Sequence, residues 1–233
     1  IAVDSNGDVY VVGQVSSNAG FFNTTANVIA NTPVRKQTNG PTDIFVVKYN
    51  RDGQMIWNKL YGGGSPDQGV GIALHSSGIY ITGFFSAPSA TFGSTTIQAS
   101  GTEGKYDAFL AKLNMNGDAL WAVSCGGFEN DYASSVAVDT DGNAYITGNF
   151  SSPATFRSAS GVSTVYSSNT TPDIFIAKYS SGGNLMAFHN SNSGTPAFGS
   201  SIAVSGSFVY VTGTIQGSNY GSTPVSYRGG GDI

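Results

Sequence analysis

The sequence predicts an all-β protein, a β-propeller of four-stranded antiparallel blades, on three observations. A tetrad of the form Tyr-x-x-Gly recurs four times, ending at Gly13, Gly83, Gly148 and Gly213, at intervals of 70, 65 and 65 residues. Short runs rich in Val, Ile, Tyr, Phe and Thr surround each tetrad. Turn sequences with Asn-Gly or Asp-Gly separate the runs, and such turns favour antiparallel hairpins.

Each unit contains the runs in a fixed order. The first run is apolar, the second holds the tetrad, the third begins with Asp, and the fourth carries Trp in two of three copies. The recurring Asp and Trp positions are Asp43, Asp107, Asp173, Trp57 and Trp121. Four strands in about 65 residues are typical of a propeller blade with one long loop. We expect one domain, residues 1–233, with three and a half repeats at about 1–70, 71–135, 136–201 and 202–233.

Within a blade, we expect the first run innermost and the Trp run outermost. The repeats supply four inner pairs of strands and three outer pairs, so a ring closed on this sequence alone would expose an unpaired edge. Either the natural chain continues into a ring of about six to eight blades, which we favour, or another molecule supplies outer strands. A β-sandwich and a β-solenoid are the alternative folds, but a sandwich needs no near-copies and solenoid coils are usually shorter.

One stretch carries a family-specific pattern without interruption. From Asp107 to Gly148 the sequence follows D-x-F-x-x-K, N-x-x-G-x-x-x-W, G-G, V-A-x-D and G-N-x-Y-x-x-G. This series resembles the bacterial β-propeller repeat family called SBBP, and the resemblance covers essentially the whole chain. It implies a propeller fold and an exported or surface location more firmly than it implies an activity.

Residues that recur in every unit are assigned to the fold, because a catalytic group need occur only once. We therefore predict that Asp43, Asp107 and Asp173 tie blades together, bonded to backbone or to the recurring Lys of a neighbouring blade. Trp57 and Trp121 are predicted to anchor blade packing. The third unit departs from the pattern, with Ala187 at the Trp position and Ala197 where Asp67 and Asp131 align. We expect its outer edge to pack differently.

The stretch DTDGN spaces Asp139, Asp141 and Asn143 like the first ligands of a calcium loop. An EF-hand-like loop needs a bidentate Glu at its twelfth position, and that position is Phe150. The corresponding turns of the second and fourth units, HSSG and SGS, lack these carboxylates. Asp and Asn in such turns hydrogen-bond backbone amides without a metal. We interpret the stretch as a turn, keep these residues as the calcium candidates, and predict no other cofactor.

The composition argues against several classes of protein. Charged residues make up 10% of the chain, the formal net charge is −4, and no basic run exists, so nucleic acid is not the expected partner. No apolar run reaches the roughly 18 residues of a membrane-spanning helix. The single Cys125 allows no internal disulfide, and we predict that it is buried. Polarity carried by Gly, Ser, Thr and Asn is common in exported β-proteins, and the resemblance to the SBBP family implies a secreted or cell-surface bacterial protein.

The residues left over by the repeat do not form a catalytic pattern. His75 and His189 are the two histidines, and neither has a Cys or carboxylate at metal-ligand spacing. Glu103 and Glu129 are the acidic residues outside the repeat. Neither a nucleophile elbow nor a phosphate loop occurs. We predict that the protein is not an enzyme.

The long loop between the second and third runs varies most between units, and loops on a rigid scaffold often carry function. Tyr166 and Tyr220 are its candidate contact aromatics. We predict an extracellular or cell-surface structural and adhesion propeller that contacts other proteins, copies of itself or surface polysaccharide. The alternative is a lectin-like, carbohydrate-binding propeller. Glycosylation-acceptor motifs occur at Asn23, Asn149 and Asn169, although such motifs are frequent in a chain this rich in Asn.

Overall fold

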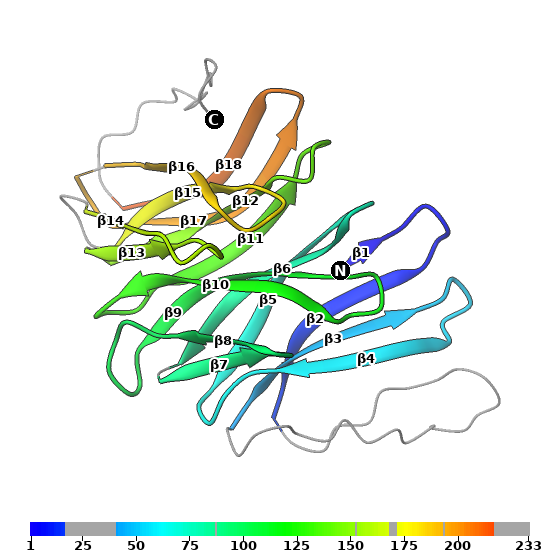
Figure 1. Cartoon of the computed structure of the whole chain (residues 1–233). Helices are drawn as coiled ribbons and strands as arrows, with labels where there is room; N and C mark the ends of the chain where they lie inside the picture. The colour runs from blue at the N-terminus through cyan, green and yellow to red at the C-terminus, as the bar shows by residue number, and fades with distance from the viewer. Residues whose placement is uncertain (17–40, 87, 152, 168–171, 193, 217–233) are drawn as a thin grey trace.

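The fold consists of antiparallel β-sheets that follow one another in a propeller-like fan (Figure 1). The computed structural model describes residues 1–16, 41–86, 88–151, 153–167, 172–192 and 194–216. These residues form eighteen β-strands and no helix. The all-β prediction is confirmed, and the described sheets do not close into a ring.

Three four-stranded sheets and one pair of strands make up the fan. Their strands are, in spatial order, β1 (Ala2–Val3), β2 (Val9–Val15), β3 (Asp43–Tyr49) and β4 (Met55–Tyr61) in the first sheet; β5 (Asp67–His75), β6 (Gly78–Ser86), β9 (Tyr106–Leu113) and β10 (Ala119–Gly127) in the second; β11 (Tyr132–Val138), β12 (Ala144–Phe150), β15 (Asp173–Tyr179) and β16 (Leu185–Asn190) in the third; and β17 (Ala197–Ser205) with β18 (Phe208–Ile215) in the last. This order matches the predicted order of runs. The first strands β5, β11 and β17 pack against the preceding sheet.

The long connection of the second and third units forms a β-hairpin rather than an open loop. The hairpins are β7 (Ser89–Phe92) with β8 (Thr95–Gln98), and β13 (Ala154–Arg157) with β14 (Ser163–Tyr166). β13 pairs with β10 of the preceding sheet and extends that sheet to six strands. Thr91 of β7 forms two backbone hydrogen bonds with Gly62, 2.9 and 3.1 Å long, just beyond the outer strand β4. Each hairpin therefore covers an edge that would otherwise be open to pairing.

Three of the four recurring glycines, Gly83, Gly148 and Gly213, face an irregular point in the first strand of their sheet. The first strand shifts register between Gly69 and Gly71, between Ala133 and Ser135, and between Gly199 and Ser201. The carbonyl oxygen just before each shift presses on the tetrad glycine of the second strand. A Cβ at Gly83, Gly148 or Gly213 would lie well inside van der Waals distance of that oxygen. A Cβ at Gly13 would lie 2.7 Å from the ring of Phe45.

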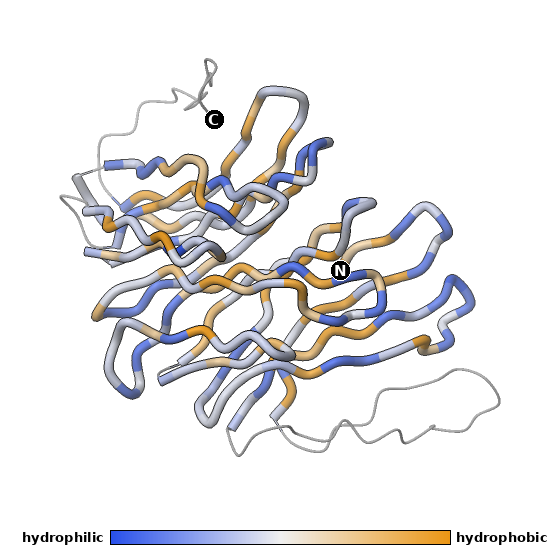
Figure 2. Tube along the Cα trace, in the orientation of Figure 1, coloured by the Kyte–Doolittle hydropathy of each residue, from blue (hydrophilic) through white to orange (hydrophobic). Residues whose placement is uncertain are grey.

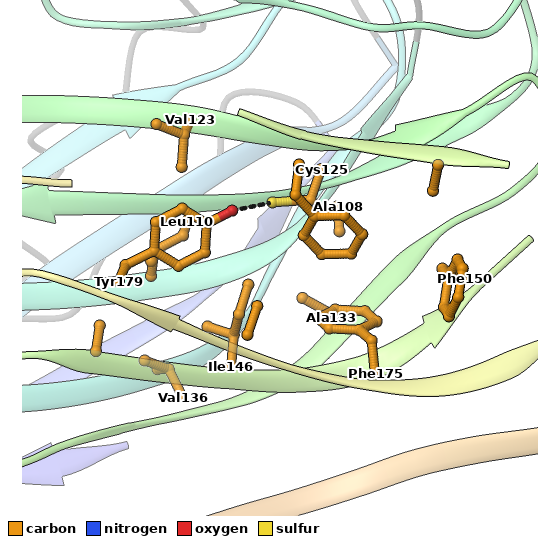
Figure 3. Packing of buried hydrophobic residues seen from close by; sticks show 14 of the residues in the cluster. Ala108, Leu110, Val123, Cys125, Ala133, Val136, Ile146, Phe150, Phe175 and Tyr179 are labelled. Carbon is orange, nitrogen blue, oxygen red and sulfur yellow. Dashed lines mark hydrogen bonds between the residues drawn. The ribbon is translucent and has the colours of Figure 1, made fainter. Parts of the chain in front are cut away.

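The hydrophobic core lies between neighbouring sheets, and the turns are mostly hydrophilic (Figure 2). Between the second and third sheets, Leu110, Val123 and Cys125 pack against Ile146 and Phe175 (Figure 3). Cys125 is buried, as predicted. Burial raises the pKa of its thiol to about 12, and its Sγ lies 3.1 Å from the hydroxyl of Tyr179.

Substitution of a tetrad glycine should destabilise the fold more than substitution of a glycine with open space around it. Gly148→Ala should lower the free energy of unfolding by about 1–3 kcal/mol, because the new Cβ is overpacked against the carbonyl oxygen of Tyr132. Gly64→Ala is the matched control, since no atom lies within 4 Å of its added Cβ. Urea unfolding of both variants measures the difference. Equal stability of the two variants would contradict the bulge as the reason for the repeated glycine.

Candidate functional site

The tetrad tyrosine is packed between the recurring Lys and Trp of its own sheet. In the second sheet, the Nζ of Lys112 lies 5.0 Å from the centre of the Tyr80 ring, and Trp121 packs edge-to-face on the same ring at 6.2 Å. Trp121 donates a hydrogen bond of 3.1 Å to the carbonyl of Ser181 in the third sheet. The first sheet repeats the ring packing with Tyr10, Lys48 and Trp57. The two Trp residues therefore lie at the junctions between sheets.

The calcium candidates form a hydrogen-bonded turn between β11 and β12. Asp139 Oδ1 accepts hydrogen bonds from the backbone amides of Asp141 and Asn143, at 3.1 and 2.8 Å. Its Oδ2 accepts from the Asn143 side chain at 2.9 Å and from the Tyr145 hydroxyl at 3.1 Å. Burial alone would raise the pKa of Asp139, but these hydrogen bonds outweigh it and hold the pKa below its ordinary value. A cation at this carboxylate would have to displace these donors.

Two recurring lysines, Lys48 and Lys178, pair with carboxylates of their own sheet, and Lys112 donates to the Ser181 carbonyl of the third sheet at 3.1 Å, which corrects the predicted pairing with the third-strand Asp of a neighbouring blade. Lys48 Nζ lies 2.8 Å from Asp8 and 3.9 Å from Asp4, in the turn between β1 and β2. Lys178 lies 3.9 Å from Asp139 in the corresponding turn of the third sheet. The register explains this outcome, because each Lys lies directly opposite the tetrad Tyr, near that turn.

A buried carboxylate fastens each of the first two junctions between sheets. Asp131 begins the third sheet, and its backbone amide donates to the Tyr106 carbonyl of the second sheet at 2.7 Å. Its side chain accepts from the amide of Gly127 in the second sheet and from that of Ser151 in the third, both at 2.7 Å. We call this arrangement the junction clasp. Asp67 forms the equivalent clasp with Thr42, Gly63 and Ser86.

The third-strand Asp lies beside the clasp and completes a pair of buried carboxyl groups. A Cβ on Gly62 would lie 2.6 Å from an oxygen of Asp67 and 2.9 Å from an oxygen of Asp43. At the next junction, a Cβ on Gly126 would be 2.6 and 2.8 Å from the two oxygens of Asp107. The first glycine of each Gly-Gly pair is therefore required by the carboxyl groups, whereas a Cβ on the second, Gly63 or Gly127, would meet the carbonyl oxygen of Ser89 or Pro153.

The third junction replaces this arrangement, which accounts for the departure seen in the sequence. Ala197 stands in place of the second carboxylate, and its amide keeps the backbone bond to the Pro172 carbonyl at 2.9 Å. Asn192 replaces the first glycine of the Gly-Gly pair and donates its backbone amide to Asp173 at 3.0 Å. Asn190 and Ser191, just before it, donate side-chain hydrogen bonds to the same carboxylate. Polar side chains thus occupy the space that the second carboxyl group takes elsewhere.

The paired carboxyl groups have raised pKa values but cannot meet a substrate. Burial raises the pKa of Asp67 and Asp131 to about 7, and the neighbouring Asp43 and Asp107 contribute to the rise. Burial raises the pKa of Asp107 to about 6. Raised carboxyl pKa values are common in active sites, but these side chains are at most 1% exposed.

The leftover residues of the sequence do not converge on one place. His75 lies in the turn between β5 and β6, accepts at Nδ1 from the Ser77 hydroxyl at 2.8 Å, and donates from Nε2 to the Thr140 carbonyl at 3.2 Å. It links two turns of adjacent sheets. Glu129 forms an ion pair of 2.5 Å with Lys105 at the opposite end of the second sheet. Among the described residues, no three His, Cys, Asp or Glu side chains group as a metal site would require.

The predicted contact aromatics lie in different surroundings. The ring of Tyr166 in β14 stacks on Phe188 with centroids 3.8 Å apart and is half-buried. Tyr220, Asn23 and Asn169 lie outside the described residues. Asn149 is buried within β12.

A set of aromatic residues breaks the repeat at the junction of the second and third sheets. Phe84, Tyr106 and Tyr132 contact one another with ring centroids 4.9–5.8 Å apart, and each is partly exposed. We call these three residues the aromatic cluster. The corresponding positions at the first junction hold Gln14, Thr42 and Gln68. The cluster was not predicted, because its residues lie outside the repeated positions; the signal in the sequence is three aromatic residues directly beside Gly83, Asp107 and Asp131.

Polar and apolar groups lie close to the aromatic cluster in the sequence, and Asn130 contacts it. Phe128 is 71% exposed, and the amide of Tyr106 donates to the Asn130 side chain at 3.1 Å. The Lys105–Glu129 ion pair adjoins them in the sequence. Partly exposed rings offer apolar contact area, and the tyrosine hydroxyls add hydrogen bonds. This surface is our candidate functional site.

The repeat matches a known family model, and two known proteins are similar in sequence to this chain. Residues 126–149 match the family model SBBP, described as a beta-propeller repeat. The chain carries an SBBP-type β-propeller repeat. It is also similar to "Uncharacterized WD repeat-containing protein L264" of Acanthamoeba polyphaga mimivirus, 30% identical over 186 residues, which cover 77% of this chain and 13% of that protein. "Regulatory protein FlaEY" of Caulobacter vibrioides is 25% identical over 146 residues, covering 62% of this chain and 14% of that protein.

The matched SBBP segment contains the structural features described above. It includes Gly127 and Asp131 of the junction clasp, the Asp139 turn and the bulge-facing Gly148. Its repeat pattern therefore corresponds to contacts that hold sheets together. Within the described residues, no helix has the length and apolarity that a membrane span requires.

The junction clasp predicts an unusual dependence of stability on pH. The Asp67, Asp107 and Asp131 carboxyl groups bind protons more tightly in the folded protein than in the unfolded chain. Folding therefore takes up protons between about pH 4 and pH 7, and the free energy of unfolding falls as pH rises through that window. Asp131→Asn should reduce the fall between pH 5 and pH 8 by at least about 1 kcal/mol. Urea unfolding at both pH values tests this, and an unchanged pH dependence would contradict it.

Proposed function

We propose that this chain is a non-catalytic scaffold outside the cell that binds another protein through the aromatic cluster and Phe128. SBBP-type and WD-repeat proteins are typically scaffolds for protein contacts. The observation that carries the proposal is the partly exposed aromatic cluster at the junction of the second and third sheets. At the first junction the corresponding positions hold polar residues.

The distribution of side-chain contacts supports a binding role rather than catalysis. The recurring Asp, Lys and Tyr residues of the first three sheets are engaged in clasps, turns and ring contacts. The aromatic cluster retains exposed ring surface, and Phe128 adds an exposed apolar side chain. Tyr and Phe are enriched at the centre of protein interfaces, where they supply much of the binding energy. The Lys105–Glu129 ion pair would lie at the rim of such an interface.

The composition supports the extracellular part of the proposal. Charged residues are only 10% of the chain, and Gly, Ser, Thr and Asn supply most of the polarity. The one cysteine is buried and has an unreactive, protonated thiol. In this proposal the protein acts at a bacterial surface as an adhesion or structural module.

Surface polysaccharide is the second candidate partner. Exposed aromatic faces beside amide and hydroxyl groups are also suited to sugar rings, and Phe128, Asn130 and the two tyrosines of the cluster present this combination. The two candidates differ in ligand and share the same surface, so one set of variants distinguishes them.

Phe128→Ser should abolish binding to the partner and leave the fold unchanged, because this side chain is exposed. Met186→Ser on β16 is the matched control, with a similarly exposed apolar side chain at 56%. Surface proteins and a glycan array are probed with wild type and both variants. Loss of protein capture in Phe128→Ser alone supports the proposal, and loss of glycan binding alone supports the polysaccharide alternative. If Phe128→Ser binds surface proteins and glycans as well as wild type does, both candidate functions are contradicted.

A further inference from the structure

The two tyrosines of the aromatic cluster have hydroxyl groups without a hydrogen-bond partner. Within the described ranges, neither the Tyr106 hydroxyl nor the Tyr132 hydroxyl forms a hydrogen bond. The tetrad tyrosines differ, since the hydroxyl of Tyr80 donates to the Gly142 carbonyl at 2.7 Å and that of Tyr145 donates to Asp139 at 3.1 Å. The cluster therefore presents two unused hydroxyl donors beside its exposed ring surface.

Contacts within the fold hold the rings of the cluster in place. Phe84 packs edge-to-face against both tyrosines, at interplanar angles of 82° and 86°. The backbone of Tyr106 is held on both sides, because its amide donates to the Asn130 side chain at 3.1 Å and its carbonyl accepts from the Asp131 amide at 2.7 Å. The ring surface is therefore preorganised, which reduces the entropy lost when a ligand binds.

Charge contributes little to the chemistry of this surface. Lys105, which precedes Tyr106, is already paired with Glu129 at 2.5 Å, so it is not available for an acidic peptide or a phosphate group. Asp107 and Asp131 are buried, and Glu103 adds one exposed carboxylate nearby in the sequence. The surface therefore selects for apolar groups and hydrogen-bond acceptors more than for charge.

A proline-rich segment has the complementary chemistry. In the polyproline II conformation the backbone forms no internal hydrogen bonds, so its carbonyls remain available as acceptors, and proline has no backbone N–H. The conformation is also preformed, and such segments dock on aromatic residues. We propose that the protein partner docks on the aromatic cluster and Phe128 through a proline-rich segment in the polyproline II conformation, whose carbonyls accept hydrogen bonds from the hydroxyls of Tyr106 and Tyr132. This inference rests on the proposed function and names the kind of segment that the site recognises.

A sugar ring matches the same surface less completely. Each sugar hydroxyl is both a donor and an acceptor, so a sugar site must supply acceptors as well as donors. Beside the cluster, the Asn130 side-chain oxygen already accepts from the Tyr106 amide, and the Asn130 carbonyl accepts from the Ser151 hydroxyl at 3.2 Å. The Glu129 carboxylate is paired with Lys105. These acceptors are engaged, whereas the tyrosine donors are free.

The test measures binding of an all-L decaproline peptide to the 233-residue protein. The peptide carries a fluorescein label, is titrated with protein and is followed by fluorescence anisotropy. We expect saturable binding. The all-D decaproline has the same composition but forms the mirror-image helix, so it should bind more weakly by about tenfold or more, equivalent to roughly 1.4 kcal/mol. Unlabelled cellohexaose should not displace the all-L peptide.

Protein variants test the role of the hydroxyl groups. Tyr106→Phe and Tyr132→Phe keep the rings and remove only the donors, so each should weaken decaproline binding by about threefold or more, as expected for one lost neutral hydrogen bond. Phe128→Ser should weaken binding further, because it removes exposed ring surface. Tyr166→Phe in the hairpin β13–β14 is the matched control and should bind as wild type does. Thermal unfolding checks that each variant is folded.

The outcomes separate this inference from the proposed function. Absence of decaproline binding, equal binding of the two enantiomers, unchanged binding in both Tyr→Phe variants, or displacement by cellohexaose would overturn the inference. If decaproline does not bind but Phe128→Ser still loses capture of surface proteins, the proposed function stands and only the inference fails. If decaproline binding depends on both tyrosines but Phe128→Ser captures surface proteins normally, the inference is supported at the tyrosines and the proposed capture through Phe128 is contradicted.

Discussion

The Asp131 carboxylate lies where the third sheet begins and the second sheet ends, and it binds backbone amides of both. This contact, with its equivalent at Asp67, determines much of the surrounding sequence. The adjacent third-strand Asp requires the first glycine of the Gly-Gly pair, because a side chain there would meet the carboxyl groups. Where Ala197 removes one carboxyl group, Asn192 replaces that glycine and donates its amide to Asp173, to which Asn190 and Ser191 also donate. The positions change together because they share one enclosed space.

This constraint separates residues that build the fold from residues that are available for recognition. Buried carboxyl groups with raised pKa values would ordinarily suggest acid–base chemistry, but here they are enclosed between sheets and recur from junction to junction. Recognition is therefore expected where the repeat is interrupted. The aromatic cluster interrupts it with ring surface at one junction.

Much of the fold was predictable because its repeated signals are local. Tyr-x-x-Gly, Asn-Gly turns and the Asp-led run set the strands and their order, and the structure confirms both. The hairpins β7–β8 and β13–β14 were missed because their four-residue strands pair with, or abut, the preceding sheet, which a local pattern does not show. The lysine partners were wrong because they depend on register across strands. The aromatic cluster was missed because Phe84, Tyr106 and Tyr132 come from three strands that meet only in the folded protein.

Amide hydrogen exchange at the second junction tests the central claim most directly. If Asp131 fastens the second sheet to the third, the amides of Gly127 and Ser151 should exchange as slowly as those inside β10 and β12. In Asp131→Ala, both amides should lose protection together. The Ala197 amide, which is bonded to the Pro172 carbonyl at the next junction, should keep its protection. Exchange of these two amides at the rate of exposed turns in the wild type, or unchanged protection in the variant, would contradict the account.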